Sequence, residues 1–402
     1  MNFRCINCGA INSGDPSSSP FCQSCGDLTE WVMEKAPTVS GLLPPPQEFT
    51  LWRYASLLPG IDEGGIVSLS EGGTPLQYSD GLAGAVGIDE LFIKNEGRNP
   101  TGSFKDRGMS VAMTLARSAG YTSSICASTG NTAASMAAYS AKAGMRAFVI
   151  VPKGKVTRAK LKQSAIYGAG VLEVEGNFDA ALDIVRDMSG SGGPAIMNSI
   201  NPYRIEGQKT GAFEVCDQLS SAPDWLIIPV GNGGNLTAYW KGFNEFRSIG
   251  AVSSLPRLVA VQAEGSSPLA SSFNEGSSTL IPVDKPETIA TAIRIGRPAN
   301  WRRAMKAIRD SNGLAVTVSD REIVKARELV AGKEGSLVEL ASASTVAAAI
   351  KLKKQGAIRK EETVVCVTTG NGLKDIDEAE APDTVTIRSA GELQMILTGK
   401  KK

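Results

Sequence analysis

The chain has 402 residues, which at roughly 150 residues per domain predicts two or three domains. Hydrophobic residues make up 42% and charged residues 21%, as in ordinary globular proteins. The 42 basic and 41 acidic residues leave a net charge of +1, which gives no indication of a nucleic-acid or anionic-membrane surface. The histidine count is 0, which excludes a Ser-His-Asp triad, an HExxH zinc site and a histidine-ligated haem. Acid–base chemistry near neutral pH therefore depends on Lys, Asp, Glu, Tyr, Cys or a cofactor.

The first ten residues, MNFRCINCGA, lack the apolar core of a signal peptide. No uninterrupted apolar stretch approaches the roughly 20 residues of a membrane span. We therefore expect a soluble, cytoplasmic protein that binds neither membranes nor nucleic acid.

The N-terminal segment carries four of the 7 cysteines as two C-x2-C pairs, each with a glycine close behind. This spacing is typical of a zinc ribbon, in which four thiolates surround one tetrahedral ion. We predict one structural zinc ion, because so small and polar a segment has little else to fold around. The alternative is a pair of reduced turns without metal. The four predicted ligands are Cys5, Cys8, Cys22 and Cys25, and the remaining cysteines, expected to fill the core, are Cys126, Cys216 and Cys366.

A proline-rich stretch, residues 36–48, is predicted to be a linker. After it, short apolar runs alternate with amphipathic segments such as 133–143 and 179–187. This alternation predicts an α/β fold with a largely parallel sheet. The last twenty residues show no strong pattern, and Lys400 to Lys402 are expected to form a solvated tail. The expected strands are residues 91–94, 124–127, 147–151, 171–175, 225–230, 258–262 and 364–368.

Ligands of open α/β sheets bind beyond the carboxyl ends of the strands, so the turns there are the candidate sites. The first, NPTGSFKDRG, begins at Asn99 and places Lys105 in the first turn of a helix. The helix dipole disfavours an ammonium there, which lowers the lysine pKa and favours a nucleophilic amine. The alternative is an exposed lysine paired with Asp106.

Two further turns have the composition of anion-binding cradles. The second, Ser128 to Thr132, offers small hydroxyl residues and free N–H groups for a carboxylate. Its Thr129 or Asn131 could equally cap the following helix. The third turn, GNGGN from Gly231, suits a lone phosphate, because it matches neither a P-loop nor GxGxxG. An ordinary tight turn is the alternative.

A fourth turn, TTGNGLKD, also follows an apolar strand. A candidate lysine nucleophile, two anion cradles and the absence of histidine together indicate pyridoxal 5'-phosphate as the cofactor.

The sequence resembles the threonine synthase family, within the tryptophan-synthase-like (fold type II) pyridoxal-phosphate enzymes. The matching segments are NEGRNPTGSFKDRGM, ASTGNTAASMAAYSAKAGM, NSINPYRIEGQKT, GNGGNLTAYWKGF, ATAIRIG and TTGNGLKD, in the family order. The resemblance implies two doubly wound α/β domains behind the zinc-ribbon-like segment. The implied boundaries are 1–30 for the ribbon, 31–100 with 198–402 for a large cofactor-binding domain, and 101–197 for a small domain.

Carried over by position, the resemblance makes Lys105 the Schiff-base lysine and proton carrier. Phe104 and Asn131 flank the cofactor, and Asn131 bonds its 3-hydroxyl oxygen. The cofactor phosphate is assigned to the backbone of Gly231, Asn232, Gly233, Gly234 and Asn235, and the pyridine nitrogen to Thr369. The substrate carboxylate is assigned to Ser128, Thr129 and Thr132, and the substrate phosphate to Asn198, Ser199 and Arg204, with help from Asn232.

Three positions depart from the family pattern. Leu340 stands where relatives usually carry Pro, and Gly233 replaces a frequent Ala; both changes are expected to be tolerated by the backbone. Arg297 follows Gly296 where Asn is common. It is either a cation that affects substrate choice or a surface charge.

The resemblance implies synthesis of L-threonine from O-phospho-L-homoserine and water. An α-proton and then a β-proton leave, phosphate is expelled from the γ-carbon, and water adds at the β-carbon. The alternative within the fold is cysteate synthase, acting on O-phosphoserine and sulfite, followed by a serine or threonine dehydratase. A non-enzymatic zinc-ribbon protein is the alternative from another class, but residues 1–29 offer only Arg4 as a basic residue. A homodimer is expected because relatives are usually dimers.

Overall fold

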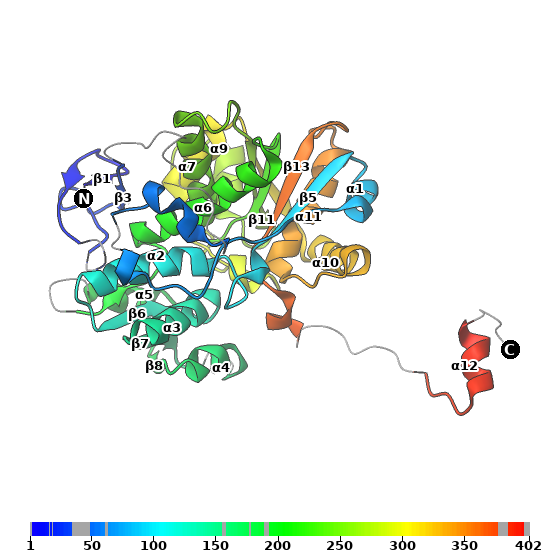
Figure 1. Cartoon of the computed structure of the whole chain (residues 1–402), viewed down its shortest axis with the longest axis horizontal. Helices are drawn as coiled ribbons and strands as arrows, with labels where there is room; N and C mark the ends of the chain where they lie inside the picture. The colour runs from blue at the N-terminus through cyan, green and yellow to red at the C-terminus, as the bar shows by residue number, and fades with distance from the viewer. Residues whose placement is uncertain are drawn as a thin grey trace.

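A computed structural model describes residues 2–15, 17, 19–33, 49–60, 63–154, 158–176, 178–188, 193–376 and 385–397. These residues form three sheets with helices packed around the two larger ones (Figure 1). The predicted linker at residues 36–48 and the terminal lysines lie outside the described residues. None of the described helices is long and apolar enough to cross a membrane.

The larger sheet has six strands in the order β12-β11-β10-β13-β5-β4, and only β4 runs antiparallel to its neighbour. Its central strands are apolar on both faces, as expected for a parallel sheet covered on both sides. The strands are β4 (Leu76–Tyr78), β5 (Glu90–Asn95), β10 (Trp225–Pro229), β11 (Arg257–Ala263), β12 (Leu314–Val318) and β13 (Thr363–Thr368).

Alternate residues of β10 show how the large sheet is covered. Trp225 and Ile227 pack into one core cluster with helices α1, α10 and α11, while Leu226 and Ile228 pack into another with α6, α7, α8 and α9. The sheet is therefore doubly wound. The bounds are α1 (Asp80–Val86), α6 (Pro202–Leu219), α7 (Gly234–Ser248), α8 (Pro268–Asn274), α9 (Trp301–Asp310), α10 (Asp320–Glu334) and α11 (Leu340–Lys354).

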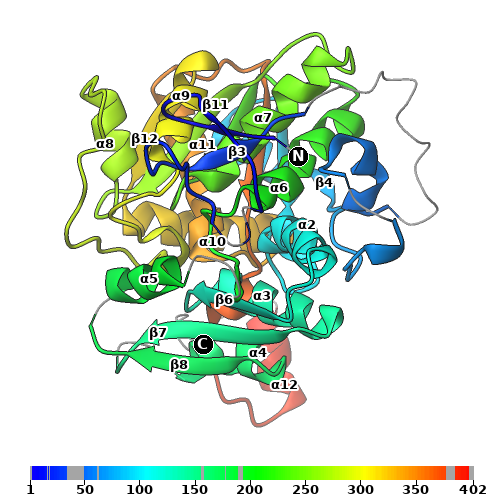
Figure 2. The ribbon, with the colours of Figure 1, turned by 90° about the vertical axis from the view of Figure 1, so that its left-hand side faces the viewer.

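The smaller sheet has four parallel strands in the order β8-β7-β6-β9 (Figure 2). Side chains from α2 and α3 pack on one side of it and side chains from α5 on the other. Its elements are β6 (Ser123–Ala127), β7 (Arg146–Pro152), β8 (Gly170–Val174), β9 (Ala195–Ile196), α2 (Lys105–Ser118), α3 (Asn131–Ala143), α4 (Arg158–Ile166) and α5 (Phe178–Asp187).

The N-terminal segment forms a third, antiparallel sheet of β1 (Phe3–Cys5), β2 (Ile11–Asn12) and β3 (Thr29–Trp31), and β3 packs against α6. At the other end of the chain, α12 (Ala390–Leu397) has no buried residue and stands apart from the rest of the molecule (Figure 1).

The structure contains all seven predicted strands and both predicted helices, with ends shifted by no more than two residues. Helix α12 was not expected, because its eight residues lie in a segment without a strong pattern. Strands β4, β9 and β12 were not predicted either. The other three cysteines fill the core as predicted, and burial raises the pKa of Cys126, Cys216 and Cys366 to about 12.

Candidate active site

The turn before α2 and the turn after β13 are joined by backbone hydrogen bonds. The N–H of Phe104 donates to the carbonyl of Thr369 at 3.0 Å, and the N–H of Asn371 donates to the carbonyl of Gly102 at 2.9 Å. These bonds hold Lys105, the first residue of α2, beside Thr369. Two segments far apart in the sequence thus form one wall of the candidate site.

Lys105 is half-buried, and its amine lies 4.1 Å from the centre of the Phe104 ring. Burial, helped by the positive charge of Arg204, lowers its pKa to about 7. The Lys105 pKa is therefore lowered, as predicted, but the causes are burial and the charge of Arg204 instead of the helix dipole. Asp106 does not pair with Lys105, because its carboxylate accepts from Thr101 and Ser135.

The side-chain amide of Asn131 is held from two sides. Its Nδ2 donates to the two carboxylate oxygens of Glu339 at 2.9 and 3.0 Å, and its Oδ1 accepts from the Lys374 ammonium at 2.7 Å. These contacts fix which way the amide points, and we call the three residues the amide network. Sequence reasoning missed Glu339 and Lys374, although both lie in segments that it had singled out.

Glu339 is 4% exposed and precedes α11. Burial, together with the negative charge of Asp375, raises its pKa to about 7, and its attraction to Lys105 acts in the opposite direction. Its carboxylate fills the space that a Cβ would occupy at Gly370. A side chain at position 370 would therefore displace Glu339, which explains the glycine in the fourth turn.

Thr369 is buried, and its hydroxyl lies 3.1 Å from that of Ser342. Ser342 also accepts from the N–H of Gly370 at 2.9 Å, so it orients the turn that carries Thr369. This serine was missed as well, because a hydroxyl inside an alanine-rich helix gives no functional signal in the sequence.

The glycine-rich third turn begins α7 with a left-handed residue. Gly233 has φ of +80°, and a Cβ there would meet Ala304 at 3.1 Å and the carbonyl of Asn300 at 3.3 Å. Glycine therefore suits this backbone better than the alanine common in relatives. Neither side-chain polar atom of the buried Asn235 has a hydrogen-bond partner among the described residues. The start of α7 thus offers an open set of donors for an anion.

The second turn leaves the N-terminus of α3 open. The cap residue is Gly130, which has no side chain to bond the first N–H groups, so neither Thr129 nor Asn131 is the cap. Ser128, Thr129 and Thr132 are half-buried around this end. Free N–H groups beside hydroxyls suit a carboxylate, and the assignment of the substrate carboxylate to these residues stays a prediction.

Arg204 on α6 is 1% exposed, and burial lowers its pKa to about 10. Only Nη1 has a partner, the carbonyl of Met197 at 3.1 Å, whereas Nε and Nη2 have none among the described residues. A buried guanidinium with two unused donors calls for an anion, because an unpaired buried charge is costly.

The other two predicted phosphate ligands are engaged with the backbone. The Asn198 amide bonds both the N–H and the carbonyl of Ala127, which joins the end of β9 to the end of β6. The carbonyl of Ser199 accepts from Asn300 at 3.2 Å. The hydroxyl of Ser199 and one N–H of Asn198 are not used in these bonds, and their phosphate role stays a prediction.

Arg297 is an exposed surface charge. It is paired at 3.1 Å with Asp284, which is also exposed, as in the surface alternative.

In the ribbon, the sulfur atoms of Cys5, Cys8, Cys22 and Cys25 all lie within 4.8 Å of one another.

Comparison with known proteins identifies the family of the chain. Residues 67–370 match the family of pyridoxal-phosphate dependent enzymes. The threonine synthase of Methanocaldococcus jannaschii is 50% identical over 383 residues, 94% of each chain. That of Synechocystis is 51% identical over 325 residues, 81% of this chain and 82% of the relative. The chain belongs to the threonine synthase family of pyridoxal-phosphate dependent enzymes.

Solved structures show the same fold at much lower identity. A threonine deaminase of Solanum lycopersicum superposes with a TM-score of 0.65 at 21% identity, covering 86% of this chain and 99% of the other. Diaminopropionate ammonia lyase of Escherichia coli gives a TM-score of 0.66 at 15% identity, covering 78% and 87%. The predicted class, fold type II of the pyridoxal-phosphate enzymes, is therefore confirmed for this member of the threonine synthase family.

Proposed function

We propose that the chain is a threonine synthase that converts O-phospho-L-homoserine and water to L-threonine and phosphate. The observation that carries the proposal is the fully buried Arg204 with two unused donors, whose charge also lowers the pKa of Lys105. A dehydratase acting on an unphosphorylated amino acid has no phosphate for this guanidinium. The relatives of about 50% identity named threonine synthase support the same activity.

The residues present fit pyridoxal 5'-phosphate. Lys105 has an amine whose pKa is lowered to about 7, the open start of α7 suits the cofactor phosphate, and Thr369 offers a neutral hydroxyl for the pyridine nitrogen. Glu339 and Lys374 orient the Asn131 amide, and the N–H of Nδ2 that Glu339 does not take would be the donor for the 3-hydroxyl oxygen. When bound, the cofactor supplies the electron sink that makes the α- and β-protons acidic.

The chain's own groups bind the substrate and carry protons. The second turn, at the start of α3, takes the carboxylate, and Arg204 with Asn198 and Ser199 takes the phosphate. A guanidinium stabilises the dianion as it leaves the γ-carbon, because two parallel donors match its oxygens. Lys105, with its pKa near 7, accepts protons from the α- and β-carbons and returns protons to the γ- and α-carbons. No step needs an imidazole.

Sheet membership supports the proposed domain division. Every element of the four-stranded sheet and its helices lies between Lys105 and Ile196, and every strand of the six-stranded sheet lies outside that range.

We also propose that Cys5, Cys8, Cys22 and Cys25 bind one zinc ion, since four converging thiolates fit its tetrahedral geometry. A homodimer is proposed from the resemblance alone, and sedimentation analysis tests it.

Product identification tests the function. The purified protein is incubated with O-phospho-L-homoserine, and separately with O-phospho-L-serine with and without sulfite. We expect threonine and phosphate from the first mixture only. Cysteate from the second would instead establish the sister activity. Lys105→Ala should lose the borohydride-reducible cofactor link and turnover, whereas Lys142→Ala, which removes an exposed lysine of α3, should keep both. A borohydride adduct on another lysine would contradict the assignment of Lys105.

A further inference from the structure

The N-terminal ribbon packs directly against the segments that carry the predicted substrate-phosphate ligands. The N–H of Ile196, the last residue of β9, donates to the carbonyl of Ser17 at 2.9 Å. The next residue is Met197, whose carbonyl holds Arg204 through Nη1. One ribbon carbonyl therefore fixes the strand end that orients the buried guanidinium.

A second contact reaches the start of α6. The ring of Phe3 packs edge-on against Tyr203, with centroids 5.6 Å apart, and these side chains are 2% and 4% exposed. Tyr203 immediately precedes Arg204. Further along the ribbon, the carbonyl of Trp31 accepts from Lys241 at 2.9 Å. Apolar packing and a charge-assisted hydrogen bond thus hold the ribbon over α6 and α7.

A third contact runs through α9. Asp27 of the ribbon pairs with Arg302 at 3.1 Å. Asn300, just before α9, donates through its amide to the carbonyl of Ser199 and through its backbone N–H to the carbonyl of Asn232. The ribbon therefore reaches the predicted phosphate ligands from both sides, through β9 with α6 and through α9.

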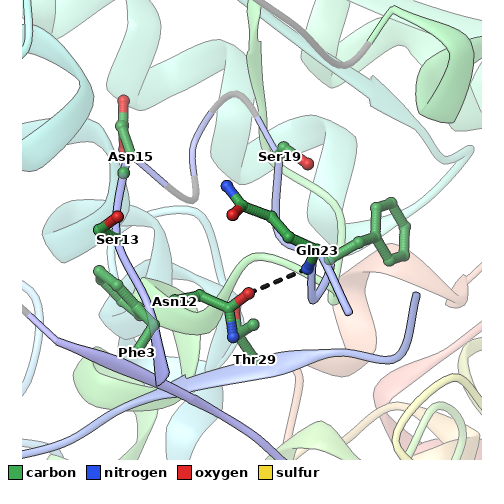
Figure 3. A pocket seen from close by; sticks show the side chains of 9 residues that line it. Phe3, Asn12, Ser13, Asp15, Ser19, Gln23 and Thr29 are labelled. Atoms are coloured by element: carbon green, nitrogen blue, oxygen red, sulfur yellow. Dashed lines mark hydrogen bonds between the residues drawn. The ribbon is translucent and has the colours of Figure 1, made fainter. Parts of the chain in front are cut away.

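The ribbon has little apolar material of its own. Its two cysteine turns are joined by Asn12, which accepts from the N–H of Gln23 at 2.9 Å and donates to the Cys22 sulfur at 3.6 Å (Figure 3). A cavity of about 110 Å³ beside this bond is lined by Phe3, Thr29 and polar side chains. Phe3 and Trp31 pack on the rest of the molecule, whereas Cys8 and Cys25 are exposed, so the order of the two cysteine turns depends on the ion that the four thiolates bind.

We propose that the ribbon is a positioning element for the substrate phosphate, so that metal in the cysteine cluster sets the affinity of the site for phosphate. The inference rests on the proposed function, because it assumes that Arg204 binds phosphate. The ribbon residues act through Met197, Tyr203 and Asn300 and do not belong to the predicted ligand set. The cofactor has its own anchors in Lys105 and the start of α7, so its retention should not depend on the ribbon.

The test uses the full-length enzyme with its cofactor and inorganic phosphate as the probe. Cys8→Ser/Cys25→Ser removes two exposed ligands. Arg302→Gln breaks the contact with Asp27 while keeping the metal site, and Lys306→Gln is its control, since Lys306 pairs within the same helix with Asp310. Four quantities are measured: zinc content, cofactor absorbance, the phosphate Kd by calorimetry, and amide hydrogen exchange across residues 196–204.

We expect the double cysteine variant to lose its zinc, keep its cofactor and bind phosphate about tenfold more weakly, the loss of roughly one charge-assisted hydrogen bond. Its KM for the phosphorylated substrate should rise while kcat changes little, and exchange at 196–204 should become faster. Arg302→Gln should weaken phosphate binding about two- to fivefold, as expected of one exposed ion pair. Lys306→Gln should leave phosphate binding unchanged.

Parent-like phosphate affinity in a folded, metal-free double variant would overturn the proposal. If that variant does not fold, the two variants in α9 provide the test. Equal phosphate Kd values for Arg302→Gln and Lys306→Gln would then overturn the proposal. A parent enzyme that binds no phosphate would instead remove the phosphate role of Arg204, and with it both the proposed function and this inference.

Discussion

Two arginines on neighbouring helices, Arg107 of α2 and Arg204 of α6, are equally buried at 1% exposure. Arg107 uses all three of its nitrogen atoms: Nε bonds Glu96, Nη1 bonds Glu214 at 2.6 Å, and Nη2 bonds both carboxylates. Among the described residues, Arg204 has one partner, a backbone carbonyl. Arg107 thus stabilises the fold, whereas Arg204 keeps donors available for a ligand.

The environments explain the difference. Opposite charges around Arg107 raise its pKa well above the usual range despite its burial, and Lys94 completes the network by pairing with Glu214 at 2.7 Å. No carboxylate of the described residues offsets the burial of Arg204, which lowers its pKa to about 10, although Cys126 acts weakly in the opposite direction. A buried charge that is fully paired is a structural part, whereas one left unpaired indicates a binding site.

The largest expected effect comes from removing the paired arginine. Arg107→Met leaves Glu96 and the Lys94–Glu214 pair with an uncompensated buried charge, which should lower the free energy of unfolding by roughly 3–5 kcal/mol in urea titrations. The control is Arg117→Met on the same helix, which removes one bond to the carbonyl of Gly65 and should cost about 1 kcal/mol. Equal losses in the two variants would show that the network does not stabilise the fold.

The substitution Arg204→Lys should damage the reaction instead of the fold. Lysine keeps the charge but offers a point charge where two parallel donors are needed, and one charge-assisted hydrogen bond is worth roughly 1.5–3 kcal/mol. We therefore expect a tenfold to hundredfold loss in kcat/KM, since 1.36 kcal/mol is about tenfold. Cofactor absorbance should survive. Release of the cofactor, or unchanged turnover of phosphohomoserine, would contradict the division between the two phosphate sites.

A third effect concerns the lysine. The positive charge of Arg204 disfavours the Lys105 ammonium, so Arg204→Met should raise the pH at which Lys105 becomes reactive in the chain stripped of cofactor. The opposite result is expected for Glu339→Gln, because Glu339 attracts the ammonium and raises its pKa. The pH dependence of Lys105 labelling by an amine-specific reagent, mapped by mass spectrometry, measures both. Shifts of the same sign in the two variants would exclude this electrostatic account.

The smallest effect is expected at an exposed arginine. Arg297 pairs with Asp284 in solvent, and surface ion pairs contribute about 0–1 kcal/mol. Arg297→Gln should therefore change kcat/KM by less than about twofold. A larger loss, seen with phosphohomoserine alone, would place Arg297 in substrate selection after all.

The sequence predicted the parts of the molecule that local patterns encode. Strands such as β10 and β13 contain continuous apolar runs and are followed two residues later by a glycine, and the turns after them carry the small residues that an anion site needs. Among the strands that were not predicted, β9 has two residues and β4 is a three-residue edge strand. Segments this short contain too little pattern to be recognised.

The amide network was not predictable in the same way. Glu339 and Lys374 bond Asn131 across 208 and 243 residues of sequence, and nothing local indicates those contacts. The same holds for the two arginines. Only the folded structure shows that carboxylates surround Arg107, whereas Arg204 keeps two nitrogen atoms without a partner among the described residues. Residue type and spacing predict which turns carry the candidate site, but the pairing of side chains within it depends on the tertiary fold.

The central position of β13 constrains how the enzyme is made on the ribosome. Its pairing with β5 joins Thr363 to Glu90, 273 residues earlier. At roughly 5–20 residues per second, β5 is synthesised about 15–55 s before its neighbour. During that interval a strand with the buried Leu91 and Ile93 lacks one partner and is a site for misassembly or chaperone binding. A nascent chain that ends before Thr369 contains Lys105 but lacks the turn that holds it in place, so chemistry cannot begin until that turn has been synthesised.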